Sequence, residues 1–346
     1  MSLQVSIDGT TIAGVLQAAI TTNNYYSSGS FSLTLAIGPS PLKSTAWWSE
    51  LGAALVNISY IDEKLDDLSE VITGRIDTVV LNPVYRTVSV EGRDLSAGLI
   101  DSYVQQDFVN QTASEILSTL AGRCGLAVEV SPTPGNVGRF FGDGYTKLSL
   151  GQFSDLRSNW DLVVQLARAK NYDVFVEGTT LNFQPAGEAS LMAIPISAGD
   201  VTAMRLERNL TVDSSNRVTV QSWNSQQMSA YNSGGSTPSA VLPDSYGTWG
   251  TGYLFSKSNL TSLQTDMYAN QYASEVSRLQ TVLHMNMPWS LEISPRSVVL
   301  LQDTDSSFDG LYQVDCVERH YSSSSGSSQT IRAVSWRYQD NSLAGI

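Results

Sequence analysis

The chain has few of the residues from which catalytic and metal sites are usually built. It contains two cysteines, Cys124 and Cys316, and two histidines, His284 and His320. None of them stands in a CxxC or Cys/His spacing, and no GxSxG or HExxH motif occurs. We expect the cysteines to be small buried residues and the histidines to be structural. The sequence therefore predicts no enzyme, no metal site and no cofactor.

Positive charge and long apolar runs are also scarce. Lys and Arg number 20 against 33 Asp and Glu, which gives a formal net charge of −13. Because nucleic-acid affinity depends on basic side chains that displace counterions, recognition of nucleic-acid sequence is not expected. No stretch approaches the length of a membrane-spanning apolar helix, and the first residues, MSLQVSIDG, do not resemble a signal peptide. We expect no stable membrane insertion.

What the chain does contain is the composition of an ordered protein, with 42 % hydrophobic residues spread over 346 positions, enough for two or three domains. Phe31–Ile37 alternates apolar with small polar residues, the pattern of a half-buried strand. Residues 1–104 are predicted to form a first antiparallel β-barrel. Its other predicted strands are Leu3–Ile7, Val56–Tyr60, Ile72–Val80 and Val84–Val90.

Residues 105–190 change to a helical period and are predicted to form a small α+β domain. Thr112 and Glu115 have the spacing of a capping box before an apolar stripe that ends at Gly122 or Gly125. A second helix is predicted over Trp160–Ala169. The predicted strands of this domain are Leu126–Val130, Tyr172–Val176 and Leu181–Phe183.

Residues 191–346 return to the β pattern and are predicted to form a second barrel. A long loop over Asn224–Ser258, rich in Ser, Gly, Asn and Pro, and a helix over Leu260–Leu279 are expected as an insertion at about 224–282. The predicted strands near the end of the chain are Leu283–Met287, Val298–Gln302, Leu311–Arg319 and Thr330–Tyr338.

The two β regions resemble each other. Each contains three runs of similar length with an acidic turn after the first, and Asp77-Thr-Val79 in one matches Asp315-Cys-Val317 in the other. Because order, length and turn character agree together, we interpret them as a duplicated unit. The predicted fold is mainly β with an α+β insert, in which two similar antiparallel β-barrel domains flank a small α+β domain.

Two acidic clusters and one glycine-rich segment are candidate sites. The cluster Asp62, Glu63, Asp66, Asp67 and Glu70 permits a metal or a glycosidase carboxylate pair, but a solvated hairpin loop is the favoured interpretation. A second cluster, Asp303, Asp305 and Asp309, resembles the start of a calcium loop without its glycine or its closing acid, and we interpret it as a turn. The glycine-rich residues 138–144 lack the context of a phosphate loop, so a connector is favoured.

Aromatic residues are candidates for an interface. Trp47 and Trp48 stand together, and further rings surround the predicted long loop, namely Trp223, Tyr246, Trp249, Tyr253 and Phe255. Exposed rings favour a protein or sugar interface, with Trp47, Trp48 and Trp249 as the candidates. Ordinary packing of each ring onto its own domain is at least as good an interpretation.

Beside these patterns, the order of several short motifs resembles a known family. They are Gly92-Arg-Asp-Leu-Ser, Leu99-Ile-Asp101, Asn110-Gln-Thr, Ser158-Asn-Trp-Asp-Leu162, Leu166-Ala-Arg168 and Val174–Phe183. Together they resemble the phage late-control D family, the baseplate hub proteins of contractile tails in P2-like and Mu-like phages. The architecture is similar to the T4-type hub and to the front half of type VI secretion spike proteins. The resemblance is strongest over residues 70–185.

The resemblance implies a structural baseplate hub, built as a homotrimer whose six barrels adapt a three-fold spike to a six-fold tail tube. The implied partners are the central spike protein and the tail tube or its initiator, with baseplate wedge and tape measure proteins as further candidates. The implied location is the virion tail baseplate, after synthesis in the host cytoplasm. Because no appended lysozyme or spike helix is visible, we expect no cell-wall cleavage by this subunit. The alternatives are a β-rich carbohydrate-binding tail or adhesin protein and, third, a glycosidase.

The Gly92-Arg-Asp turn is expected to be the exit from the first barrel. We hypothesise that an ion pair between Arg93 and Asp94 fixes this exit, and we include Trp160 and Asp161 among the candidate structural residues because they belong to the resembling motifs.

Overall fold

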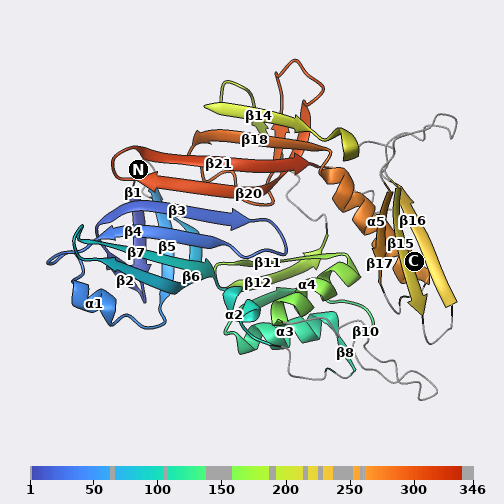
Figure 1. The fold of residues 1–346 in the computed structure, drawn as a ribbon, viewed down its shortest axis with the longest axis horizontal. Coiled ribbons are helices and arrows are strands. Elements are labelled where there is room, and N and C mark those ends of the chain that lie inside the picture. Colours follow the sequence, from blue (N-terminus) through green and yellow to red (C-terminus); the bar gives the residue numbers. More distant parts are fainter. Residues whose placement is uncertain are drawn as a thin grey trace.

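In a computed structural model, the chain forms a long curved array of strands with one helical unit below it and a second helix beside a short sheet at one end (Figure 1). Nothing described includes a helix long and apolar enough to cross a bilayer. The structure describes residues 2–62, 67–103, 108, 110–137, 158–186, 192–212, 217–224, 229–236, 252–257, 260 and 262–336.

The first barrel forms because alternating side chains from every one of its strands meet in one core. In SFSLTLA, Phe31, Leu33 and Leu35 are at most 3 % exposed, as the alternation predicted. The strands, all antiparallel, lie in the order β3-β4-β7-β6-β5-β1-β2, and a short helix α1 (Thr45–Ser49) packs on them. Their bounds are β1 (Ser2–Ile7), β2 (Thr10–Ile12), β3 (Val15–Asn23), β4 (Ser30–Ala36), β5 (Leu55–Asp62), β6 (Asp67–Asn82) and β7 (Thr87–Asp94).

The second barrel has a separate hydrophobic core. Its strands lie in the order β14-β18-β21-β20-β19-β13. One pair, β13 with β19, is parallel, and the other strand pairs of this barrel are antiparallel, as the sequence predicted. The bounds are β13 (Ile194–Ile196), β14 (Ala203–Arg208), β18 (Thr281–Pro288), β19 (Val298–Leu301), β20 (Gly310–Ser322) and β21 (Gly326–Ser335).

Between the barrels in sequence lies the α+β unit, with its own core. Two helices pack together and against the sheet β11-β12-β9, in which β9 and β12 are parallel. Its elements are α2 (Ala97–Ile100), β8 (Gln111–Thr112), α3 (Ala113–Arg123), β9 (Ala127–Val130), β10 (Asn136–Val137), α4 (Asn159–Lys170), β11 (Tyr172–Glu177) and β12 (Thr180–Pro185).

The prediction of one long loop over Asn224–Ser258 is wrong, because part of this segment belongs to a short sheet that has a hydrophobic cluster of its own. Two segments inside that loop are strands, β16 (Ser229–Ser236) and β17 (Gly252–Ser256), and both pair with β15 (Arg217–Asn224). The helix expected there is confirmed as α5 (Ser262–Arg278), which packs on the sheet. Gly and Asn have low strand propensity, so pairing with β15 and cover by α5 determine β16 rather than its composition. A short 3₁₀ turn, Leu210–Val212, precedes β15.

Both main helices of the α+β unit begin with a capping box. In α3 the Thr112 hydroxyl accepts the Glu115 N–H at 3.3 Å, and the Thr112 N–H donates to Glu115 Oε2 at 2.8 Å, as the spacing predicted. Ser158 and Asp161 make the same exchange in α4.

Replacing the cap residue Thr112→Ala removes one of these bonds and exposes an unsatisfied N–H. We expect a loss of about 1 kcal/mol in the free energy of unfolding, measured by chemical denaturation. Thr119→Ala is the matched control, because its hydroxyl only back-bonds to the Glu115 carbonyl within the same helix; its effect should stay within about 0.5 kcal/mol. Equal losses in the two variants would contradict a capping role.

Candidate functional site

The two barrels repeat one strand plan. In chain order the first uses β1, β3, β4, β5, β6 and β7, and the second uses β13, β14, β18, β19, β20 and β21. The sheet orders, β3-β4-β7-β6-β5-β1 and β14-β18-β21-β20-β19-β13, match position by position. The barrels differ in the extra strand β2 and in the direction of the last strand, since β1 is antiparallel and β13 parallel to its neighbour. The duplication seen in three strands of the sequence thus extends to six.

A β-bulge marks the same place in both barrels. The register between β6 and β7 shifts at Asp77, and the register between β20 and β21 shifts at Asp315. These are the aspartates of the matching sequence triplets. Each is bonded to an arginine of the next strand, Asp77 to Arg93 and Asp315 to Arg332, although the two arginines occupy different register positions. The sequence similarity therefore reflects a shared backbone irregularity.

The barrels are joined edge to edge by β3 and β20. The first half of β20 pairs with β19, and beyond its bulge the strand pairs with β3, from Cys316 opposite Asn23 to Ser322 opposite Gln17. The described strands of both barrels consequently form one continuous sheet. The sequence did not indicate this seam, because a contact between strands almost three hundred residues apart leaves no local pattern.

A buried arginine lies on the inner face of the seam. Arg319 is 4 % exposed, donates to the Ile293 carbonyl at 2.8 Å and to Thr22 Oγ1 at 3.3 Å, and lies 5.9 Å from the centre of the Trp289 ring. Trp289 in turn stacks on Tyr60 inside the first barrel. Burial lowers the pKa of Arg319 to about 10. The guanidinium thereby links a strand of each barrel to the segment that passes between them.

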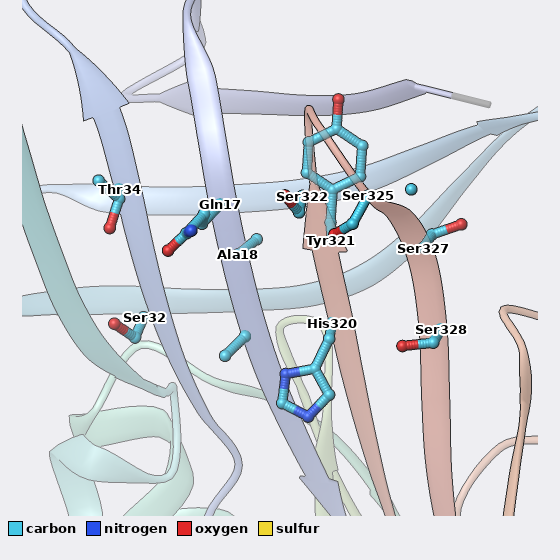
Figure 2. A pocket seen from close by; sticks show the side chains of 12 residues that line it. Gln17, Ala18, Ser32, Thr34, His320, Tyr321, Ser322, Ser325, Ser327 and Ser328 are labelled. Atoms are coloured by element: carbon cyan, nitrogen blue, oxygen red, sulfur yellow. The ribbon is translucent and has the colours of Figure 1, made fainter.

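The outer face of the seam carries a hollow lined by neutral and mostly polar residues. A shallow hollow of about 320 Å³ crosses β3, β4, β20 and β21, and Figure 2 shows His320 beside small side chains from these strands. Its other lining residues include Gln17, Ser32, Thr34, Ser322, Ser325, Ser327 and Ser328. The two histidines stand on strands, His284 on β18 and His320 on β20, as expected. Within the residues that the structure describes, no group of three His, Cys, Asp or Glu side chains is placed to hold a metal ion.

The expected ion pair between Arg93 and Asp94 is wrong. Neighbouring residues of a strand point to opposite faces, so the two side chains diverge. Arg93 donates to Asp77 at 2.6 Å and to Asp101 at 2.9 Å, and Arg75 also reaches Asp101 at 2.8 Å. These hydrogen bonds from Arg93 hold the pKa of Asp101 below its usual value. Arg93 therefore ties the bulge of β6 to the end of α2, the first helix after the barrel.

Asp94 organises the opposite face of the same exit. It is 9 % exposed and accepts hydrogen bonds from the Ser28 hydroxyl at 2.7 Å, from the Gly29 N–H and from both the N–H and hydroxyl of Ser96. The β3–β4 loop is thus fastened to the turn that leaves the barrel. The exit is fixed by two independent clusters.

Gly92 is required by close packing. A Cβ at this position would lie 2.1 Å from the Arg75 carbonyl oxygen and 2.5 Å from the ring of Phe31, and Gly74 meets the same ring. Phe31 belongs to the buried core of the first barrel. The ring can reach its position only because β7 and β6, the next two strands of the sheet after β4, both present glycine there.

Trp160 and Asp161 belong to the first turn of α4. Asp161 completes the capping box, and Trp160 is 7 % exposed and donates from Nε1 to the Tyr26 carbonyl at 3.3 Å. Tyr26, in the β3–β4 loop, also donates from its N–H to the Val174 carbonyl and from its hydroxyl to the Tyr172 carbonyl. This loop therefore connects the first barrel to the α+β unit through hydrogen bonds, a contact that no sequence pattern indicated.

The second barrel reaches the α+β unit through Arg296. Its guanidinium lies 3.8 Å from the centre of the Phe175 ring and forms an ion pair with Glu177 at 3.4 Å. Sequence patterns gave no sign of this contact either.

The remaining candidate residues lie in different places. Trp48 is buried in the first core, with Trp47 packed edge-on against it at 4.8 Å, so Trp48 offers no surface to a partner. Trp223 is 56 % exposed. Cys124 and Cys316 are half-buried rather than fully buried. Trp249, Tyr246, residues 138–144, and Glu63 and Asp66 of the first acidic cluster lie outside the described residues, as do the side chains of Asp62 and Asp67.

Glu70 lies on β6 and contacts polar side chains of β5 and β6, whereas the second acidic cluster makes ordinary turn contacts. Glu70 accepts from Asn57 and Thr73, and Asp309 accepts from the hydroxyl and N–H of Thr304, which closes the turn that also holds Asp303 and Asp305. The interpretation of this second cluster as a turn is confirmed.

Comparison with known proteins supports the fold. No protein-family model matches the chain, and no curated protein matches it in sequence. Among solved structures, a tail protein from Neisseria meningitidis superposes with a TM-score of 0.69 at 14 % identity, covering 97 % of both chains. The 43 kDa tail protein of prophage MuSo2 from Shewanella oneidensis gives 0.67 at 15 % identity, covering 96 % of both.

A more distant structural match comes from a secretion system. The E. coli c3393 protein, a type VI secretion component described as similar to the T4 tail proteins gp27 and gp5, gives a TM-score of 0.56 at 9 % identity over 96 % of this chain and 77 % of that one. The chain has the mainly β fold of these proteins, as the sequence resemblance implied.

The hydrogen bonds of Arg93 with Asp77 and Asp101 should make the free energy of unfolding depend on pH. Arg93→Gln removes the donor that lowers the pKa of Asp101, so at pH 7 we expect a loss of unfolding free energy of about 1 kcal/mol or less for these partly exposed groups. The stabilisation is complete above the unfolded pKa of about 3.9 and is lost as pH falls through the lower folded value. The gap between variant and wild type should therefore narrow below pH 4 in denaturation at stepped pH. Arg205→Gln, at an exposed pair, is the control, and a gap independent of pH would contradict the linkage.

The packing of Gly92 predicts a strong effect from one methyl group. Gly92→Ala must displace either backbone or the Phe31 ring, and we expect it to cost about 2 kcal/mol or more in thermal or chemical unfolding. Gly122→Ala, in α3 where a Cβ meets nothing within 4 Å, should instead stabilise by about 0.5 kcal/mol. A neutral Gly92→Ala would show that the close approach is not needed.

Proposed function

We propose that the chain is a structural hub subunit of a phage tail or related injection machine, in which three copies close a ring of six barrels. The observation that carries the proposal is the repeated strand plan, six strands in the same order in each barrel. Three copies with two similar barrels each would present six similar units, while the ring as a whole keeps three-fold symmetry. Such a ring is suited to join a three-fold spike to a six-fold tube.

The seam supports a scaffold role. A ring that transmits assembly from spike to tube needs two barrels held in a fixed relation, and a continuous β ladder with a buried guanidinium across it is a rigid connection. The α+β unit is bonded to both barrels through Tyr26 and Arg296, which would fix its position on the ring. The solved structures with this fold are tail and secretion-system proteins, which supports a spike and a tube as partners and the virion as location.

The rival role of a glycan-binding tail protein depends on exposed aromatic rings. Of the tryptophans first considered for an interface, Trp48 is buried and Trp47 is half-buried against it. Trp223 is 56 % exposed, and Trp249 lies outside the described residues. The proposed hub role requires no reaction. Of the acidic cluster on which the glycosidase alternative depends, Glu70 accepts hydrogen bonds from Asn57 and Thr73.

The mass of the full chain in solution tests the ring. We expect light scattering over a range of concentrations to approach three times 37.5 kDa, and negative-stain images to show a three-fold ring with a central opening. A chain that remains a monomer or forms a dimer throughout would overturn the self-assembling ring. Binding of that monomer to a glycan array would favour the carbohydrate-binding alternative.

A further inference from the structure

We infer how copies of the chain join: the edge strand β14 of one copy pairs with the C-terminal half of β6 in the next, repeating the β3–β20 seam between molecules. The inference rests on the proposed ring of three and names the surfaces that would close it. Each copy would offer one β14 edge and accept one at β6.

The first observation is a segment of β6 in the first barrel that pairs with another strand on one side only. In β20 the residues before the bulge pair with β19 and those after it, 316–322, pair with β3. In β6 the residues before the bulge pair with β5, but residues 78–82 have a strand beside them on one side only, β7, in the described part of the chain. The residues after the bulge thus pair with β3 in the second barrel, whereas the equivalent residues of the first barrel have no second partner strand in the described part of the chain.

The second observation is the matching edge in the second barrel. By position in the sheet, β14 corresponds to β3. Strand β3 lies next to β4, which pairs with β7, and β14 lies next to β18, which pairs with β21, the counterpart of β7. Strand β3 has β4 on one side and β20 on the other, whereas β14 pairs with β18 and ends the strand order of the described residues. The seam is formed by β3 and by residues 316–322 of β20. Their counterparts, β14 and residues 78–82 of β6, each pair with a strand on one side only in the described part of the chain.

The register follows from the ladders. Alignment of the bulges, Asp77 with Asp315, places Val80 where Glu318 stands in the second barrel. The ladders that lead outward from β7 and from β21 place Glu207 at the position of Thr21. Because Glu318 is opposite Thr21 in the seam, Val80 should be opposite Glu207 of the neighbour.

Burial agrees with this register. At the seam the inward residues Ile20 and Val317 are 1 % and 0 % exposed. Their counterparts at the open edges, Leu206 and Val79, are only partly buried against their cores, as are the next inward residues, Met204 on β14 and Leu81 on β6. An added strand would cover both rows in the way that the seam covers its own.

The open edge of β6 also lacks the usual protection of a solvent-facing edge. Thr78–Asn82 carries no charge and no proline, and Val80 is 56 % exposed. Uncharged edges of this kind are prone to pair with another chain, which natural proteins normally prevent. A second copy of this chain fits because its β14 is the counterpart of β3, which already pairs with the equivalent edge of β20.

Pairing of this kind joins unlike surfaces, so it propagates from copy to copy and ends only when the rotation closes. In the proposed ring, six barrels would be linked by six similar seams, three within chains and three between them. The intermolecular seams would place Leu81 where the internal seams have Arg319.

Cysteine cross-linking tests the register. The double variant Val80→Cys/Glu207→Cys places thiols opposite each other on the exposed strand face, at the Cα separation of about 4.5–5.5 Å that a disulfide accepts. Figure 1 shows β14 and β6 far apart within one chain, so an internal disulfide cannot form. Under mild oxidation we expect linked dimers and a closed, covalent trimer on a non-reducing gel.

Matched variants separate this geometry from chance contact. A mixture of the two single variants should stop at linked dimers, because each chain then carries only one half of the pair. Asn82→Cys/Glu207→Cys keeps both thiols on the same face but two positions out of register and should link much less. The wild-type chain controls for its own half-buried Cys124 and Cys316, and circular dichroism confirms that each variant is folded.

Measurement of the mass of the same samples keeps the two proposals apart. A trimer by light scattering that gives no cross-link, or links equally in the out-of-register variant, overturns the strand pairing and leaves the ring intact. Register-specific linking in a chain that is otherwise monomeric supports the pairing and contradicts a stable ring. A monomer that does not link contradicts both.

Discussion

The β3–β20 ladder is the contact on which the rest of the structure depends. It is the only pairing between strands of the two barrels in the described residues, and it turns two curled sheets into one. Its inner face is completed by Arg319, whose burial is tolerated because a carbonyl and a hydroxyl accept its hydrogen bonds and Trp289 lies beside it. Without this ladder the barrels would be held together only by the α+β unit and by single contacts such as the stacking of Trp289 on Tyr60.

The exit from the first barrel explains why the α+β unit has a defined position. Arg93 and Asp94 are neighbours, yet one strand sends them to opposite faces, where they fasten different partners. Arg93 connects the bulge of β6 to the end of α2, and Asp94 connects the exit turn to the β3–β4 loop that carries Tyr26. The bulge that terminates one pairing thus also supplies the carboxylate that orients the next domain.

Much of this fold could be predicted from the sequence because strand alternation, capping boxes and short motifs involve residues close together along the chain. The alternation around Phe31, the Thr112–Glu115 box and the Asp77 and Asp315 triplets each correspond to a feature of the structure. Contacts between distant segments were not predicted, because no spacing of residues along the sequence indicates them. They include the seam, the hydrogen bonds of Tyr26 to the α+β unit and the Arg296–Glu177 ion pair. Strand β16 was missed for another reason, because its Ser, Gly and Asn residues depend on neighbours for their conformation.

Duplication within one chain also permits the two barrels to diverge. The β3–β4 connection of the first barrel is a short loop that holds the α+β unit, while the corresponding β14–β18 connection of the second contains β15, β16, β17 and α5. Identical barrels from six separate chains would have to carry the same loops at every position. In the proposed ring, similar strands would preserve a six-fold pattern while unlike loops reduce it to three-fold, which is the physical requirement for a part that meets partners of both symmetries.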